Sequence, residues 1–365
     1  MARRTAPPPV EPGTILLIGG TGDVGRRLVS LLLDQTRHRV QVISRSGRTP
    51  DARVEALKLD IGASDDAAGL ALDATVVNLT EATPPSVAAR VVQAGGRFLE
   101  TSASPDYVQA INDAAAAAGG PGTGVICVGT APGLSTLIAA DVARTQGCAT
   151  IDIGLELGMG RHYGAAATEW SIGALGAPYR TGGTGSALRP GDQRRSFAFG
   201  QTSRERPAIG TGFPHQGIAG HSGAGSQVQT RTFLAFDPSY VTRLVLLLLR
   251  LGLGPVLARH KRGLTRVLMR LPSLGRTSTR IAVEARAADG RVLAARHVTV
   301  GDQAEVTAAM IVATIRAFED NPAPPSGATT IVDHLTPDAA LDALRGLLPE
   351  MAIETWSGGP EANRS

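Results

Sequence analysis

The segment TILLIGGTGDVGRR, residues 14–27, constrains the fold more than any other part of the chain. An apolar run enters a glycine cluster and continues into an amphipathic stretch, which predicts a strand, a tight turn and a helix. Gly20, Gly22 and Gly25 fit the spacing G-x-G-x-x-G, and starting from Gly19 gives the related G-x-x-G-x-x-G. Such glycines turn the chain, admit a pyrophosphate to the backbone and let the helix pack on its strand. The segment therefore predicts dinucleotide binding, the alternative being a turn that serves only tight packing.

The end of the second predicted strand, residues 39–44, bears on which cofactor binds. An NAD-selective site usually has an acidic residue there, which accepts hydrogen bonds from the ribose 2′-hydroxyl. Here Ser44 is followed by Arg45 and Ser46. A guanidinium can bind a 2′-phosphate bidentately and hydroxyls add donors, so the pattern favours NADP(H) over NAD(H). The alternative is that Arg45 is a solvated turn residue.

Strand and helix patterns alternate as far as residue 145, which predicts a Rossmann domain with a doubly wound parallel sheet and right-handed crossovers. Further strands are expected at 54–60, 74–79, 97–100 and 124–129, and helices near 67–72, at 85–94, at 105–118 and after the turn at Pro132. Ligands of such sheets bind at the carboxyl ends of the strands, although these ends can also be ordinary polar turns. The predicted cofactor-binding residues are Gly19, Gly20, Thr21, Gly22, Asp23, Val24, Gly25, Ser44, Arg45, Ser46, Asp60, Asn78, Thr80, Glu81, Gly129, Pro132 and Gly133.

The stretches GGTGDVGRRL, DATVVNLTEAT, AGGRFLETSAS and GTAPGLSTLIAADVA resemble the saccharopine dehydrogenase superfamily, in particular its saccharopine-reductase-like branch. The match is good over the first 145 residues and looser at 160–170 and 298–317. The resemblance implies an NAD(P)-binding domain, a second α+β domain with a mixed sheet, and a C-terminal helix that returns to the first domain. It also implies hydride transfer between nicotinamide and an imine or secondary amine, and it leaves the substrate open.

The second half of the chain contains strand-like runs at 150–157, 230–236, 280–286 and 291–300. Residues 173–225 are crowded with Gly, Ser, Arg and Pro, which predicts either a lid that excludes water from a hydride-transfer site or a surface insertion. We therefore divide the chain into a disordered tail (1–12), a Rossmann domain (13–145), a substrate or dimerisation domain (146–303), a C-terminal helical segment (304–350) and a second tail (351–365).

A proton donor for an imine needs a mobile proton near neutral pH, which favours histidine. His162 beside Tyr163, with Glu169 seven residues after His162, forms the first candidate catalytic group, and His215 and His221 form the second. A lone histidine can equally be structural or solvated. A carboxylate-bearing substrate needs arginine forks, and the available residues are Arg161, Arg180, Arg194 and Arg195.

Residues 238–283 contain no acidic side chain, although nine Arg and Lys residues lie there among leucines at helical spacing. A leucine face beside a basic face fits a membrane surface, an acidic carrier protein or another subunit, and it also fits solvated helices that cover a sheet. The apolar run 244–249 is much shorter than the roughly 20 residues of a membrane span. A homodimer is expected.

Several function classes are disfavoured by composition. Two cysteines, Cys127 and Cys148, have no metal-ligand spacing, so we expect no bound metal and a reducing compartment, the cytoplasm. Aromatic residues make up 4% of the chain, which disfavours nucleic-acid binding. The sequence thus predicts an NADP(H)-dependent oxidoreductase that acts on a small molecule. A carrier-dependent enoyl reductase, implied by the family, and a non-catalytic NADP-binding protein attached to a membrane or partner are the alternatives.

Overall fold

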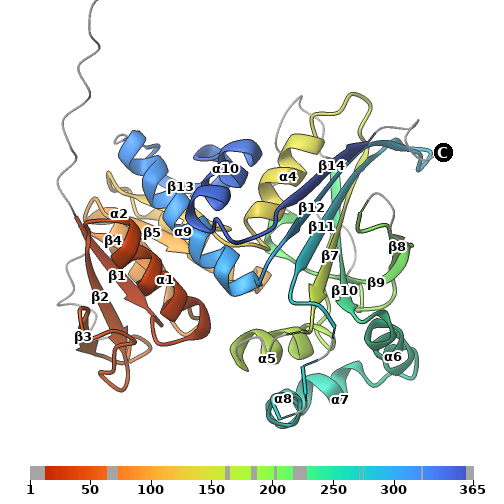
Figure 1. Ribbon diagram of the computed structural model, residues 1–365, viewed down its shortest axis with the longest axis horizontal. Coiled ribbons are helices and arrows are strands. Elements are labelled where there is room, and N and C mark those ends of the chain that lie inside the picture. The colour runs from red at the N-terminus through yellow and green to blue at the C-terminus, as the bar shows by residue number, and fades with distance from the viewer. Residues whose placement is uncertain are drawn as a thin grey trace, which may run out of the picture.

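The computed structural model describes residues 13–63, 73–160, 165–181, 187–200, 204–216, 228–270, 272–273, 275–321 and 324–358. Within these ranges the chain forms two seven-stranded sheets with helices around them, seen side by side in Figure 1. The predicted tail at 1–12 and the helix predicted near 67–72 lie outside the described residues.

The first sheet is parallel throughout and has the order β13-β6-β5-β4-β1-β2-β3. The inner strands β1 and β4 are largely buried on both faces, as their continuous apolar runs predict, whereas the edge strands β3 and β13 are more exposed. The strands are β1 (Thr14–Ile18), β2 (Arg39–Ser44), β3 (Glu55–Lys58), β4 (Thr75–Asn78), β5 (Arg97–Glu100), β6 (Thr123–Ile126) and β13 (Gly327–Thr330). This sheet confirms the Rossmann fold.

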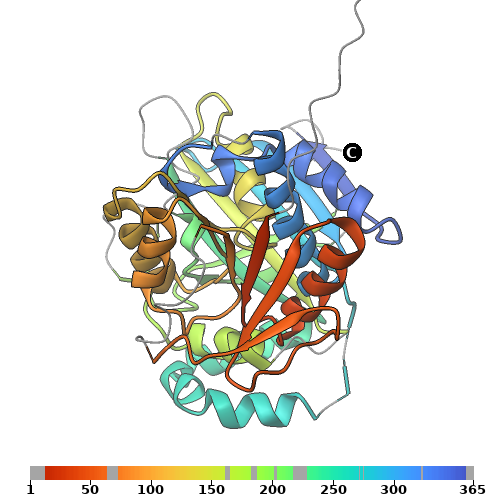
Figure 2. The same cartoon turned by 90° about the vertical axis from the view of Figure 1, so that its left-hand side faces the viewer.

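Two pairs of helices cover the first sheet. On one side α2 (Pro85–Gln93) packs against α3 (Pro105–Ala117), and on the other α1 (Asp23–Gln35) packs against α9 (Gln303–Asp320), as Figure 2 shows. The helix α9 is the C-terminal helix that was expected to return to the first domain. It is almost wholly buried, and α10 (Pro337–Leu347) packs on it.

The second sheet is mixed and has the order β14-β12-β11-β7-β10-β9-β8, in which only β7 and β10 run parallel. Apolar side chains of β7 face α4 (Leu134–Val142) and join the main hydrophobic core. The strands are β7 (Thr150–Gly158), β8 (Arg194–Phe197), β9 (Arg206–Thr211), β10 (Gln229–Asp237), β11 (Thr279–Arg286), β12 (Val292–Val300) and β14 (Glu354–Gly358).

Four helices lie below this sheet in the view of Figure 1: α5 (Ala165–Ala174), α6 (Ser239–Arg250), α7 (Gly254–Arg259) and α8 (Lys261–Leu268). The strands β8 and β9 lie in the stretch 173–225, for which the sequence predicted a lid or insertion. β14 lies in the predicted tail after residue 351. These strands are four to six residues long, and β9 and β14 pair with β10 and β12, which local composition does not reveal.

Candidate active site

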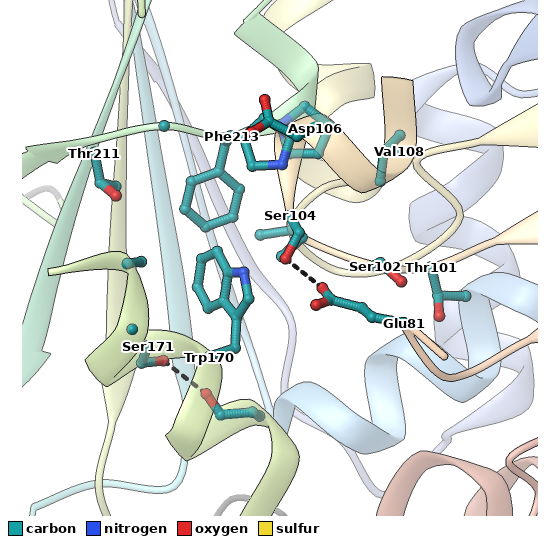
Figure 3. A pocket seen from close by; sticks show the side chains of 18 of the residues that line it. Glu81, Thr101, Ser102, Ser104, Asp106, Val108, Trp170, Ser171, Thr211 and Phe213 are labelled. Carbon is teal, nitrogen blue, oxygen red and sulfur yellow. Dashed lines mark hydrogen bonds between the residues drawn. The ribbon is translucent and has the colours of Figure 1, made fainter. Parts of the chain in front are cut away.

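A cleft of about 1690 Å³ lies between the carboxyl ends of the first sheet and the elements below the second sheet. Its walls include the glycine turn after β1, the loops after β4 and β5, and residues of α5 and α8. Figure 3 shows the part of the cleft where both halves of the chain meet. A pocket for one drug-sized ligand measures roughly 300–1,000 Å³, so this cleft has room for more than one such ligand.

The glycine turn has the geometry that its sequence predicted. Gly22 donates from its amide to the Gly19 carbonyl over 3.0 Å and is the N-cap of α1. A Cβ on Gly25 would lie 2.4 Å from the carbonyl oxygen of Gly20, so this glycine permits the helix to pack on the turn. Gly19 and Gly22 line the cleft, and the first amides of α1 have no acceptor within the helix. The turn therefore presents free donors to an anion.

Arg45 lies directly after β2 and also lines the cleft. Its side chain is exposed, and no hydrogen bond or ion pair engages it within the part of the chain that the structure describes. Its neighbours turn away from the cleft, because Ser44 donates from Oγ to the Arg48 carbonyl and Ser46 Oγ accepts from the Arg48 amide. Arg45 is thus the basic group beside the glycine turn that remains available to a ligand.

Behind the cleft wall, the ends of β4 and β5 hold a buried polar network. Asn78 donates from Nδ2 to Glu100 Oε2 over 2.5 Å and accepts from the Thr83 hydroxyl over 2.6 Å. The Tyr107 hydroxyl donates to the Thr83 carbonyl over 2.9 Å. Asn78 and Glu100 are fully buried, so Asn78 fixes the loop that carries Thr80 and Glu81 and does not itself line the cleft.

Burial raises the pKa of the Glu100 carboxyl to about 7, from 4.5 when it is exposed. The folded protein therefore retains a proton that the unfolded chain loses between these values, and the unfolding free energy should fall as pH rises from about 4.5 to 7. Between the pH values below and above this range, the contribution of Glu100 to the unfolding free energy changes by about 3 kcal/mol. We expect Glu100→Gln to lack this component of the pH dependence. Urea unfolding of both proteins at pH 4.5, 6 and 8 measures it.

Glu100→Gln can also change the unfolding free energy by the same amount at every pH, because a new amide lies beside Asn78. This constant offset does not affect how the unfolding free energy changes with pH. The pH-dependent difference is the quantity of interest. Parallel curves of unfolding free energy against pH for wild type and Glu100→Gln would show that the pKa of Glu100 is not raised in the folded protein.

The turn after β6 connects the cleft to α9. Gly133 caps α4 and donates to Thr136 Oγ1 over 3.1 Å. Thr130 lines the cleft, and its hydroxyl donates to the Gln303 carbonyl over 3.0 Å while its amide donates to Thr307 Oγ1 over 3.3 Å. Gly129, Pro132 and Gly133, which were predicted to touch the cofactor, shape this turn from behind, and Thr130 and Ala131 face the cleft instead.

The second domain contributes an aromatic and charged wall. Trp170 of α5 meets Phe213 edge to face, with ring centroids 5.2 Å apart and an interplanar angle of 72° (Figure 3). On the opposite wall Ser104 donates from Oγ to Glu81 Oε1 over 2.5 Å. The Glu169 carboxylate lies 3.4 Å from Lys261 Nζ and 3.5 Å from Arg262 Nε. The cleft therefore offers an apolar surface beside two cations.

His215, one of the two histidines in the second candidate group, stands behind this wall. Its side chain is fully buried, and burial lowers the pKa of its imidazole to about 3. The ring stacks on Phe213 with centroids 5.2 Å apart and shares hydrogen bonds with Thr232 over 2.9 Å and Ser135 over 3.4 Å. His215 thus supports the aromatic wall and does not line the cleft.

The structure gathers part of the predicted set in one cleft. The predicted residues that line it are Gly19, Gly22, Asp23, Val24, Gly25, Arg45, Thr80, Glu81, Glu169 and Arg180. Gly20, Thr21, Ser44, Ser46 and Asp60 do not line it, although Gly20 packs within the turn itself. His162, Tyr163, Arg161 and His221 lie outside the described residues.

Sequence reasoning did not single out Lys261 or the Trp170–Phe213 pair as site residues. Lys261 is one of only two lysines in a chain that otherwise uses arginine, which was an available signal. Phe213 lies in the stretch predicted as a lid, about 40 residues after Trp170, so their contact depends on tertiary structure.

No protein-family model and no curated protein matches the chain. Among solved structures, a mutant meso-DAP dehydrogenase of Clostridium tetani aligns with a TM-score of 0.45 and 11% identity, over 92% of this chain and 99% of that one. A dihydrodipicolinate reductase of Paenisporosarcina sp. aligns with a TM-score of 0.40 and 10% identity, over 89% of this chain and 100% of that one. A D-galactose-1-dehydrogenase of Rhizobium etli aligns with a TM-score of 0.40 and 12% identity, over 93% of this chain and 96% of that one.

Proposed function

We propose that the protein is an NADP(H)-dependent oxidoreductase whose cofactor lies along the glycine turn and whose substrate binds against the second domain. The observation that supports this most directly is the continuity of the cleft, which joins the glycine turn and Arg45 to the Trp170–Phe213 wall. A dinucleotide on the turn can thus place its nicotinamide end toward the substrate-sized space beside that wall.

The residues of the turn fit the cofactor. A Cβ on Gly22 would meet only the Gly19 carbonyl oxygen, at 3.3 Å, and otherwise open space, which leaves room for a pyrophosphate against the backbone. The amides of α1 would hold the pyrophosphate, and Arg45 would hold the 2′-phosphate. Thr80 and Glu81 lie at the end of β4, near the expected position of the nicotinamide. The cofactor supplies a hydride, or accepts one, at this end of the cleft.

We further propose that the substrate carries an anionic group and a carbon–nitrogen bond that is oxidised or reduced, as the resemblance to saccharopine reductases implies. Lys261 and Arg262 would bind the anionic group, and Glu169 orients both cations. Trp170 and Phe213 would exclude water from one side of the substrate. Glu81, which accepts a hydrogen bond from Ser104 on the opposite wall, is a candidate for proton transfer, together with the predicted His162 and Tyr163.

Replacing Arg45 by alanine should lower NADPH affinity roughly 30-fold and leave NADH affinity unchanged, because charge-assisted hydrogen bonds contribute about 2 kcal/mol. Trp170 lies in the cleft, so quenching of its fluorescence can report binding. Arg48→Ala is the matched control, since Arg48 is exposed in the same turn but does not line the cleft.

If the wild type prefers NADPH and only Arg45→Ala removes the preference, substrates with C=N and C=C bonds can be screened with NADPH to separate imine from enoyl reduction. If neither nucleotide binds, the glycine turn has only a structural role and the oxidoreductase proposal fails.

A further inference from the structure

The helices α6, α7 and α8 form a surface, here called the α6–α8 patch, whose apolar side chains have no partner. Within these three helices only Thr242, Gly254 and Thr265 are buried. In the described part of the chain, every exposed large hydrophobic residue lies between positions 240 and 268: Tyr240, Leu244, Leu247, Leu251, Val256, Val267 and Leu268. Soluble surfaces rarely group such residues unless they contact another surface.

The apolar residues follow one side of the helices. Leu244, Leu247 and Leu251 are spaced by three and four residues, which places them on one face of α6 and its C-terminal turn. They are 54%, 52% and 65% exposed. The three helices are joined by short turns and lie along one edge of the molecule, at the bottom of Figures 1 and 2. A flat surface can contact all of them together, whereas a groove on a partner typically receives a single helix.

The charge of the patch has one sign. Residues 238–283 contain no Asp or Glu. Arg243, Arg250, Arg259, Arg266 and Arg270 are exposed, and none forms an ion pair with a carboxylate in the part of the chain that the structure describes. Among the described residues, Lys261 and Arg262 pair with Glu169, across the mouth of the cleft.

This combination selects among the possible occupants. A second copy that met this patch through a two-fold axis would bring two acid-free basic surfaces together, which is repulsive. An anionic bilayer offers negative headgroups to the arginines and an acyl boundary to the leucines at the same time. No helix in the described residues is long and apolar enough to cross a membrane.

We propose that the α6–α8 patch docks the protein on anionic lipid surfaces. The leucines enter the headgroup region, and the arginines contact lipid phosphates and carboxylates. Ala258, Lys261 and Arg262 line the cleft as well as belonging to the patch, so docking brings the mouth of the cleft to the lipid surface. This inference does not depend on the cofactor or on the reaction.

The test is co-sedimentation of the full-length protein with vesicles of phosphatidylcholine alone, or of phosphatidylcholine with 30–40% phosphatidylserine, at roughly 0.05 and 0.5 M NaCl. We expect binding to the anionic vesicles at low salt, at least a tenfold weaker partition coefficient at high salt, and little binding to neutral vesicles.

Two triple variants probe the two components of the contact. Leu244→Ser, Leu247→Ser and Leu251→Ser together should weaken partitioning at least tenfold. Reversal of three cations should weaken it about a hundredfold; the substitutions are Arg243→Glu, Arg250→Glu and Arg259→Glu. The matched control reverses three exposed arginines elsewhere and should bind like the wild type; it carries Arg53→Glu, Arg291→Glu and Arg345→Glu.

Circular dichroism and urea unfolding establish whether each variant is folded, which we expect because all the substituted side chains are exposed. Three outcomes would overturn the proposal. One is equal binding to neutral and anionic vesicles, and a second is equal losses in the control and the patch variants. The third is a wild type that ignores vesicles but forms a dimer in analytical ultracentrifugation that the leucine variant dissociates, because the patch would then be a subunit interface.

Discussion

Replacing Gly22 by alanine should lower NADPH affinity at least a hundredfold, about 2.7 kcal/mol, without unfolding the protein. Gly22 has φ −70° and ψ −178°, which alanine adopts without strain. The new Cβ would lie 3.3 Å from the Gly19 carbonyl oxygen, with no other atom within 4 Å. The methyl group would therefore be tolerated by the fold and would occupy the space through which a pyrophosphate reaches the backbone amides.

The measurement is a fluorescence titration with NADPH, accompanied by urea unfolding of the same preparation. Gly346→Ala is the control, because Gly346 lies on the exposed side of α10 and a Cβ there meets nothing within 4 Å. Unchanged affinity in Gly22→Ala would show that the cofactor does not lie along this turn. Loss of affinity together with a large loss of stability would mean that Gly22 is needed for folding, and that the variant does not test binding.

Replacing Gly133 by alanine should mainly lower stability, in contrast to Gly22→Ala. We expect the unfolding free energy to fall by at least about 4 kcal/mol. A Cβ on Gly133 would lie 1.8 Å from the Gly129 carbonyl oxygen and 2.4 Å from two further Gly129 atoms. These are backbone atoms of a turn that Thr130 ties to α9, so they have little freedom to move. The turn would have to open, and α4 would lose its cap.

Gly133 also has φ +143°, a conformation that disfavours any side chain. Gly119→Ala separates that strain from the clash, since Gly119 has φ +66° and a Cβ there meets nothing within 4 Å. Strain of this kind costs about 1–2 kcal/mol. Similar losses in the two variants, measured by urea unfolding, would show that the turn around Gly129 relaxes more easily than the structure indicates.

The glycine turn and the strands around it could be predicted because their signals are local. The residues from Gly19 to Gly25 fold within one turn, and the strands β2 and β5 begin and end where their apolar runs do. The position of Arg45 at the cleft follows from its place directly after the second strand, because ligands of such sheets bind at the carboxyl ends of the strands. Such features need no knowledge of distant contacts.

The remaining parts depend on contacts that the sequence does not display. The strand β13 has only four residues, Gly327–Thr330, and pairs with β6 about 200 residues earlier. The role of Asn78 depends on Glu100 and Tyr107, which lie 22 and 29 residues later and form a buried support for the loop together with it. The ion pair between Glu169 and Lys261 joins α5 to α8, although about 90 residues separate the two side chains in the sequence.

The return of β13 and α9 to the first sheet has a consequence for how the protein can be made. A ribosome synthesises the glycine turn long before the helix that covers α1 and the strand that completes the sheet edge. Until then, α1 has no partner for the face that it turns to α9, and β6 lacks its outer neighbour. The half of the chain that contains the glycine turn should therefore become resistant to protease only after nearly the whole chain has emerged, which makes it a poor candidate for expression as a separate fragment.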